Sequence, residues 1–299
     1  MTVNKLILHS HAKLNLYLKI VGKRKDGYHS LQTIFERIDL ADTVIIRPSL
    51  TRRISLSCNK SSLPRGRANL AFQSAKLLQK ACAVSKGADI ELIKRIPVGA
   101  GLGGGSSNAA AVLLGLNKLW KLGLSLDKLL VFGRKIGSDV AFFLYNCSFA
   151  LGEGRGDRIK PFHLQGVRPL WQILVVPRIE VRTPRVYREW DAARQKKKSL
   201  WLTISQSNVN IISSALRKGD LTRLGQGLFN SLERITLGLY PQVGVVKKRL
   251  SDLGLKSILM SGSGPAVFSV VSSKKKAVSL SRLLTREHPH WQIFATRTV

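Results

Sequence analysis

Apolar and polar positions alternate most clearly near the start of the chain. Between His11 and Val21, every even position from 14 to 20 is leucine or isoleucine, and the odd positions from 13 to 19 are polar or tyrosine. This period of two predicts a half-buried strand. Lys13 and Asn15, two residues apart, should then lie side by side on the face opposite the leucines.

The same patterning divides the rest of the chain into short strands and helices. The segment 152–161 is rich in glycine and charge, which is typical of a turn or a domain join. Asp139 precedes an apolar stretch that we expect to be a strand. Separate groups of strands and helices indicate the α+β class. The predicted strands are 31–38, 43–47, 53–57, 89–96, 171–177 and 291–296, the predicted helices are 68–83, 106–116, 207–218 and 240–253, and strand, glycine turn, strand and helix follow from 256 onward.

Length allows two domains or one large one, but the charge is unusual. Of 299 residues, 49 are Lys or Arg and 17 are Asp or Glu, a net charge of +32. Such an excess attracts polyanions, so an RNA-binding protein is one hypothesis. The basic residues are dispersed, however, with no basic tail or repeat. We therefore expect mostly solvated surface charge, part of which gathers anionic substrates.

Three features predict a soluble cytoplasmic protein. Its three cysteines are odd in number and form no CxxC pair, which favours reduced thiols. The first ten residues lack the apolar core of a signal peptide. No uncharged apolar run approaches the roughly 20 residues of a membrane span.

Five glycines between Gly99 and Gly105 form the most informative motif. They follow the predicted strand 89–96 and lead into the helix 106–116, with a serine available as its N-cap. Glycine permits positive φ and close approach of a ligand to the backbone. Together with the N–H groups of a helix N-terminus, this arrangement predicts a polyphosphate site.

Other glycine-rich loops fit less well. A Walker A loop would end in Gly-Lys-Ser/Thr, but no lysine follows before Lys118. A dinucleotide fold would place an acid at the end of a second strand, whereas Asp127 begins a predicted helix. A protein-kinase loop would join two strands. A plain tight turn rarely needs five glycines. The motif is best interpreted as a nucleotide-phosphate loop.

The segment 97–110, Pro-x-Gly-x-Gly-Leu-Gly-Gly-Gly-Ser-Ser-Asn-Ala-Ala, resembles the central motif of the GHMP kinases. Five further segments resemble the 4-diphosphocytidyl-2-C-methyl-D-erythritol kinase family within them: 12–20, 26–32, 136–140, 182–187 and 260–265. The resemblance implies a two-domain α+β GHMP kinase fold, with a nucleotide-binding domain over 1–158, a substrate domain over 159–299 and the active site in the cleft between them. It also implies ATP-dependent phosphorylation of the 2-hydroxyl of 4-diphosphocytidyl-2-C-methyl-D-erythritol, in the non-mevalonate isoprenoid pathway.

The resemblance also assigns catalytic roles. Taken alone, Asp139 would be a capping or turn aspartate and Lys13 a solvated strand residue. By resemblance, Asp139 is the general base or orienting acceptor for the attacking hydroxyl. We expect Lys13 to lower the pKa of that hydroxyl and Asn15 to hold the hydroxyl or Asp139 in register.

For the cytidine, the resemblance implies an aromatic sandwich. Tyr28 would stack on the base, His29 would hydrogen-bond its edge, and Tyr187, where many relatives carry phenylalanine, would cover the other face. Thr183 would contact the cytidine side. Before the resemblance, Tyr28 and His29 could equally be hairpin rings covering a core edge.

The remaining implied contacts belong mainly to the nucleotide. Asn69, Lys94 and Asn108 match positions near the adenine or ribose. The turn 260–264 would shape the floor of the substrate site, and Ser231 replaces an acid common in relatives. No His/Cys/Asp cluster has metal-ligand spacing, so Mg²⁺ should arrive with ATP. The full set of expected ATP-binding residues is Asn69, Lys94, Pro97, Gly99, Gly101, Leu102, Gly103, Gly104, Gly105, Ser106, Ser107 and Asn108.

Another GHMP kinase, of the homoserine or mevalonate type, is the nearest alternative, and Tyr28, His29 and Tyr187 argue against it because those substrates have no base. The expected partners are the diphosphocytidyl substrate and ATP, with no specific nucleic acid and no membrane. A monomer or a homodimer is expected.

Overall fold

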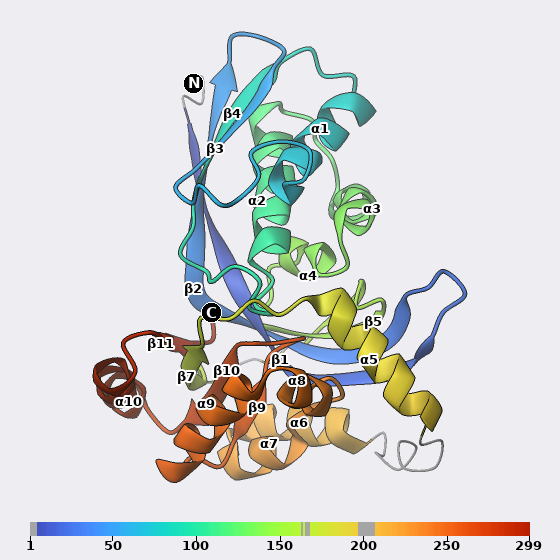
Figure 1. The fold of residues 1–299 in the computed structure, drawn as a ribbon. Helices are drawn as coiled ribbons and strands as arrows, with labels where there is room; N and C mark the ends of the chain where they lie inside the picture. The colour runs from blue at the N-terminus through green and yellow to red at the C-terminus, as the bar shows by residue number, and fades with distance from the viewer. Residues whose placement is uncertain (1–4, 163, 165–167, 197–206) are drawn as a thin grey trace.

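The computed structural model describes residues 5–162, 164, 168–196 and 207–299, so parts of both expected domains lie outside the described residues. Two β-sheets organise the chain (Figure 1). A seven-stranded sheet has the order β3-β4-β2-β1-β8, with β5 paired to β2 and β6 to β5. A four-stranded sheet has the order β11-β7-β10-β9. The α+β class and the two-part fold are confirmed.

The strands largely match the sequence pattern, although two of them are much longer than expected. β2 merges the predicted strands 31–38 and 43–47 into one. The first sheet contains β1 (Leu6–Lys23), β2 (His29–Ser49), β3 (Ile54–Cys58), β4 (Gly87–Ile93), β5 (Phe149–Gly154), β6 (Arg158–Pro161) and β8 (Phe229–Asn230). The second contains β7 (Trp171–Val176), β9 (Ile258–Met260), β10 (Val267–Val271) and β11 (Gln292–Arg297).

The helices cover both sheets. In Figure 1, α1 to α4 pack beside the upper part of the first sheet, and α6 to α10 surround the second. The helices are α1 (Leu70–Ala81), α2 (Gly104–Leu119), α3 (Leu126–Ile136), α4 (Val140–Leu144), α5 (Thr183–Lys196), α6 (Ser207–Lys218), α7 (Leu221–Gly227), α8 (Glu233–Leu239), α9 (Pro241–Asp252) and α10 (Lys274–Glu287).

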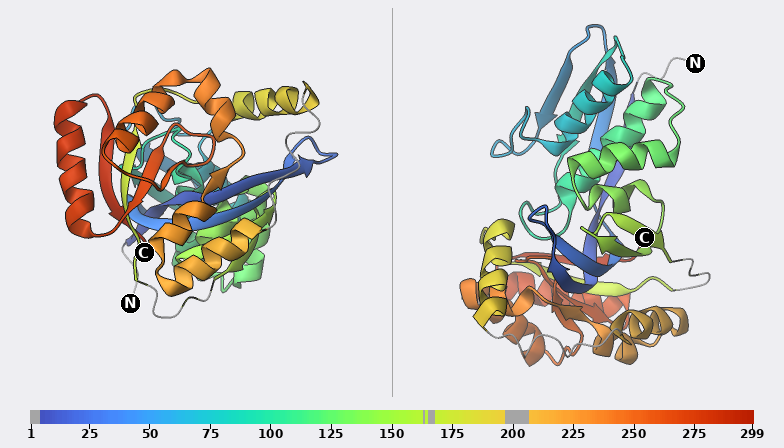
Figure 2. Two further views of the ribbon diagram at one scale, coloured as in Figure 1. Left: turned by 90° about the horizontal axis from the view of Figure 1, so that it is seen from below. Right: turned by 90° about the vertical axis from the view of Figure 1, so that its right-hand side faces the viewer.

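β1 and β2 run through both halves of the molecule as one antiparallel ribbon (Figures 1 and 2). The prediction of a half-buried β1 was wrong, because all residues from Ala12 to Leu18 are buried. Helix α2 packs on this ribbon. Leu14 and Leu16 of β1 pack in a core cluster with Leu174 and Phe268 of the second sheet, while β8 pairs along the edge of β1. Both faces of β1 therefore lie inside the protein, which places its polar residues in a sheltered environment.

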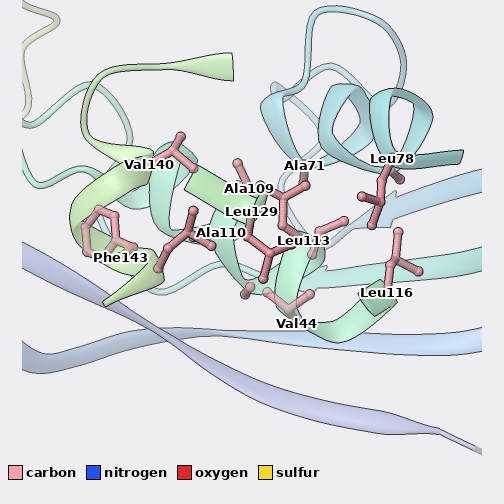
Figure 3. Packing of buried hydrophobic residues seen from close by; sticks show 14 of the residues in the cluster. Val44, Ala71, Leu78, Ala109, Ala110, Leu113, Leu116, Leu129, Val140 and Phe143 are labelled. Atoms are coloured by element: carbon pink, nitrogen blue, oxygen red, sulfur yellow. The ribbon is translucent and has the colours of Figure 1, made fainter. Parts of the chain in front are cut away.

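Figure 3 shows how the upper core forms. Apolar side chains from α1, α2, α3 and α4 meet over β2, with Leu113 of α2 and Val44 of β2 among them. Because the alanines of α2 have small side chains, α2 can lie close to both the sheet and its helical neighbours. This packing fixes the N-terminus of α2, where the glycine loop ends.

One local prediction was wrong: the apolar stretch after Asp139 forms the short helix α4 rather than a strand. The segment 152–161 does contain a turn, at 155–157, which joins β5 to β6 in a hairpin of the first sheet. The domain boundary at 158 stays a prediction. No helix in the described ranges is long and apolar enough to cross a membrane. The cytoplasmic location stays a prediction.

Candidate active site

The glycine loop leads into α2 without any capping side chain. Its N-cap is Gly103, in the left-handed region with φ of 70°, so the expected serine N-cap was wrong. Gly99 and Gly101 also have positive φ, of 67° and 74°. The first N–H groups of α2 have no partner within the helix. With no side chain capping them, they are available to an anion.

A second glycine turn packs against this loop. A Cβ atom at Gly101 would lie 2.2 Å from the Ser261 carbonyl oxygen, so only glycine fits there. The Ser261 hydroxyl donates to the Gly101 carbonyl oxygen at 3.2 Å and accepts from the Asn15 backbone N–H at 3.2 Å. The turn 260–264, expected to form the floor of the substrate site, thus ties the loop to β1.

Lys13 and Asn15 lie side by side as predicted. The Lys13 Nζ donates to the Asn15 Oδ1 at 2.5 Å, and the Asn15 Nδ2 donates to the Thr33 Oγ1 at 2.8 Å. Lys13 is only 4% exposed, although its sequence position alone suggested a solvated residue. Hydrogen bonding on both sides of Asn15 holds the ammonium group in one place.

Asp139 faces this pair from the start of α4. Its Oδ2 lies 3.4 Å from the Lys13 Nζ. Although Asp139 occupies the N-cap position of α4, its side chain makes no capping hydrogen bond. The carboxylate therefore remains available as an acceptor, and it is partly exposed at 28%. Three residues from two segments, β1 and the start of α4, thus place an ammonium, an amide and a carboxylate close together.

A cavity of about 540 Å³ opens at this point. Lys13, Asn15 and Asp139 line one end. The opposite end is formed by the hairpin between β1 and β2 and by the first turns of α5, which lie side by side in Figures 1 and 2. The glycine loop contributes Gly101 and Gly103, and the second turn contributes Gly262 and Ser263.

Aromatic rings gather at the hairpin end of the cavity. The His29 and Tyr187 ring centroids are 4.8 Å apart with an interplanar angle of 31°. Tyr28 is 58% exposed, and the Arg155 guanidinium lies 5.2 Å from its ring centroid. Burial, followed by the charge of Asp139, raises the pKa of Tyr187, so its hydroxyl stays neutral. The structure thus brings the three predicted base-binding rings to one end of the cavity.

The side chains of Lys94 and Asn108 form hydrogen bonds with each other and with a buried carboxylate. The Lys94 Nζ donates to Asp42 and, at 2.8 Å, to the Asn108 Oδ1. Asp42 also accepts from the backbone N–H groups of Arg95 and Ile96. These side chains brace the segment before the glycine loop against α2. Their expected place near the adenine or ribose stays a prediction.

Other expected site residues have local structural roles. Asn69 is the N-cap of α1, where its side chain accepts from the Ala71 N–H at 2.9 Å. The Ser107 hydroxyl accepts from the Ser10 hydroxyl at 2.8 Å and is buried. Thr183 begins α5 and lines the cavity, and its Oγ1 lies 2.7 Å from the Ser263 Oγ, within hydrogen-bond distance.

Ser231 lies away from the cavity lining. Its hydroxyl accepts from the Ile20 backbone N–H at 3.1 Å, and its own N–H donates to the Leu18 carbonyl oxygen. Position 231, where the family resemblance led us to expect an acid, therefore binds the backbone of β1 beside β8, and serine makes these hydrogen bonds without a charge.

Several residues of the cavity were not found from the sequence. Lys23, Arg155, Arg188 and Asp191 all line it, and three of these four are basic. They surround the aromatic end with positive charge, which favours an anionic ligand. One signal was present: Asp191 lies four residues after Tyr187, so both fall on one face of a helix.

No group of three or more His, Cys, Asp or Glu side chains within the described ranges could hold a metal ion. The carboxylate nearest Lys13 in the described ranges is that of Asp139, which follows Ser138, and Ser106 lies in the first turn of α2. Hydroxyl and carboxylate oxygens suit Mg²⁺ when phosphate oxygens complete its coordination.

Comparison with known proteins agrees with this geometry. Residues 69–147 match the GHMP kinases N terminal domain, and residues 212–289 match the GHMP kinases C terminal domain. A 4-diphosphocytidyl-2-C-methyl-D-erythritol kinase from Bacillus pumilus is 41% identical over 265 residues, which cover 89% of this chain and 88% of the relative.

Solved structures extend the comparison to the fold. The crystal structure of a 4-(cytidine 5'-diphospho)-2C-methyl-D-erythritol kinase has a TM-score of 0.77 and 33% identity, covering 98% of this chain and all of the other. A homoserine kinase from Cytophaga hutchinsonii has a TM-score of 0.75 at 20% identity, covering 100% and 96%, and shares the fold. The chain therefore belongs to the 4-diphosphocytidyl-2-C-methyl-D-erythritol kinase family of the GHMP kinases.

Proposed function

We propose that this protein transfers the γ-phosphoryl group of ATP to the 2-hydroxyl of 4-diphosphocytidyl-2-C-methyl-D-erythritol, as a step of the non-mevalonate isoprenoid pathway. The observation that carries the proposal is the cavity itself. It joins a lysine–carboxylate pair at one end to a cluster of aromatic rings at the other. A substrate with an alcohol at one end, a base at the other and a diphosphate between them fits this layout.

Asp139 and Lys13 perform the chemistry in this account. Phosphoryl transfer requires a positioned hydroxyl and compensation for charge on the transferred group. Asp139 accepts or orients the hydroxyl proton, because its carboxylate is not used as a helix cap. Lys13, held by Asn15, stabilises negative charge on the attacking oxygen.

The backbone of the glycine loop holds the phosphates of ATP. The uncapped N–H groups at Gly104, Gly105 and Ser106 form a cradle that side chains do not fill. A Cβ atom at Gly103 would lie only 3.0 Å from Lys13 and Phe143, so the loop is built for close approach. ATP supplies the phosphoryl group. Mg²⁺ arriving with ATP would neutralise phosphate charge, and Ser106 would be the side-chain oxygen donor for it at the start of α2.

Tyr28, His29 and Tyr187 receive the cytosine ring. The basic side chains of Lys23, Arg155 and Arg188 line the same end of the cavity and offset the charge of the diphosphate. Thr183 also lines the cavity and would contact the cytidine side of the substrate. A homoserine or mevalonate substrate would leave this aromatic end without a ligand.

An ADP-release assay tests the proposal. The purified protein is given ATP with the diphosphocytidyl substrate, with mevalonate or with homoserine, at equal concentrations. We expect release only with the diphosphocytidyl substrate. Faster release with either small alcohol would contradict the proposal and favour another GHMP kinase activity. The Asp139→Asn variant is the control. Loss of ADP release in this variant would show that the signal comes from this site.

A further inference from the structure

One face of α5 holds the ring of His29. Tyr187, Trp190 and Asp191 are spaced by three and four residues, so their side chains share a helix face. Tyr187 lies along the His29 ring with centroids 4.8 Å apart, and Trp190 meets it edge-on at 5.7 Å and 89°. Packing from two directions leaves the imidazole little freedom to rotate.

The third residue of this face, Asp191, binds one nitrogen of the ring. Its Oδ1 lies 2.8 Å from the His29 Nε2, and its Oδ2 accepts from the Lys23 Nζ at 2.7 Å. Burial acts to raise the pKa of Asp191, but the hydrogen bonds from His29 and Lys23 outweigh it and lower that pKa below its ordinary value. Asp191 is therefore ionised at neutral pH.

An ionised carboxylate only accepts hydrogen bonds. The His29 Nε2 must therefore carry the proton. In a neutral imidazole the other nitrogen, Nδ1, is then an acceptor. Nδ1 has no hydrogen-bond partner in the part of the chain that the structure describes, and His29 lines the substrate cavity.

We propose that Asp191 is a positioning residue that fixes His29 as a hydrogen-bond acceptor, so that the site selects a base with an amino group over one with a carbonyl group. The inference rests on the proposed function, because it concerns the base of that substrate. Cytosine carries an amino group where uracil carries a carbonyl oxygen. An accepting Nδ1 would bind the first and repel the second.

Lys23 completes the arrangement. By binding the second carboxylate oxygen, Lys23 holds Asp191 in the orientation that meets His29. The three residues come from β1, β2 and α5, so the contacts of Asp191 with Lys23 and His29 join α5 to the first sheet beside the cavity. The same contacts fix the orientation of the His29 ring.

Substrate preference tests the proposal. The values of kcat/KM are measured for the cytidine substrate and for its uridine analogue, in the wild type, Asp191→Asn and Asp191→Glu. We expect the wild type to prefer cytidine by roughly 10- to 100-fold, since an unpaired polar group in a closed site is costly. Asp191→Asn should reduce the preference toward unity, mainly through KM, because an amide can donate as well as accept. Asp191→Glu should restore part of it.

A matched control and a direct observation accompany the kinetics. Asp252→Asn removes a carboxylate paired with Lys248 on the surface of α9, and it should leave the preference unchanged. Nitrogen-15 NMR of the His29 ring reports which nitrogen carries the proton. We expect the neutral Nε2–H form in the wild type and a mixture of forms in Asp191→Asn.

Three results would overturn the proposal: an Nδ1–H or doubly protonated His29 in the wild type at pH 7.5, a tautomer unchanged by Asp191→Asn, or an unchanged base preference. A wild type inactive on both nucleotides would instead contradict the proposed function. In that case the NMR spectrum would still decide whether Asp191 controls the His29 ring.

Discussion

The Nζ of Lys13 lies 3.4 Å from the Oδ2 of Asp139. One residue is on β1 and the other begins α4, and the fold brings them together at the end of the cavity beside the glycine loop. The pair has the geometry of an ion pair, yet the carboxylate is partly exposed and open to a ligand. A hydroxyl placed between them would meet a proton acceptor and a positive charge together.

Asp139→Asn should keep the fold but remove most of the turnover. The amide has nearly the same shape but accepts a proton poorly, so we expect kcat to fall by roughly 10²- to 10⁴-fold. Steady-state ADP release measures this loss. Asp127→Asn, on the exposed first turn of α3, is the control and should retain wild-type turnover. An Asp139→Asn enzyme with normal kcat would exclude a catalytic role for the carboxylate.

Tyr187→Ala should raise KM for the diphosphocytidyl substrate while leaving ATP affinity unchanged. A base stacked on an aromatic ring contributes roughly 1–3 kcal/mol, which corresponds to about a 5- to 150-fold change. Tyr187→Phe keeps the ring and should behave nearly like the wild type. Weaker ATP binding in Tyr187→Ala would show that this end of the cavity holds the nucleotide instead.

Gly103→Ala should weaken ATP binding. The new Cβ atom would crowd Lys13 and Phe143 at 3.0 Å and would occupy a residue whose φ is 70°. Gly123→Ala is a matched control, since Gly123 has a similar φ of 63° but open space around it. Each should lose about 1–2 kcal/mol of stability from backbone strain. Only Gly103→Ala should show an increased ATP Kd in calorimetry, and equal Kd values for the two variants would contradict the phosphate cradle.

Glu36 should make the protein less stable as pH rises. Full burial, only partly offset by hydrogen bonds from Thr298 and Gln172, raises the pKa of Glu36 to about 8. Between its unfolded pKa of 4.5 and about 8, the folded state binds a proton that the unfolded state releases, so stability falls over this range. Glu36→Gln removes the titration and should raise unfolding free energy at pH 7 by up to about 3 kcal/mol.

Urea titrations at pH 5 and pH 7.5 measure the effect of Glu36. The wild type should lose stability between the two pH values by more than Glu36→Gln does. Because the two proteins differ at one side chain, the other titrating groups contribute equally to the pH dependence of both unfolding free energies. An identical pH dependence in both would mean that Glu36 is ionised in the folded protein.

The sequence predicted most of the helices and strands and many of the residues that line the cavity. A period of two placed Lys13 beside Asn15, and the crowding of glycines located the turn that leads into α2. The burial of both faces of β1 could not be predicted, because part of the cover comes from the second sheet, whose residues lie far along the chain. The helical form of α4 was missed because five apolar residues carry no distinguishing period.

Contacts between distant segments were the least predictable. The approach of Asp139 to Lys13 came only from family resemblance, since nothing in either local sequence indicates the other. The pairing of Asp191 with His29 was missed altogether. The burial of Lys94 against Asp42 was also missed, because a lysine after a strand is ordinarily exposed. Such pairs depend on how the two halves pack, which local patterns do not encode.

The position of the transferred phosphate tests the central claim most directly. In 4-diphosphocytidyl-2-C-methyl-D-erythritol, carbon 2 carries both the methyl group and the hydroxyl, so it has no hydrogen. Proton-coupled phosphorus-31 NMR of the reaction of wild-type protein, ATP and this substrate should show a new phosphomonoester signal without splitting by a proton on the ester carbon. A doublet or a triplet would place the phosphate on carbon 3 or carbon 1, and no new phosphomonoester signal would mean that the proposed transfer does not occur.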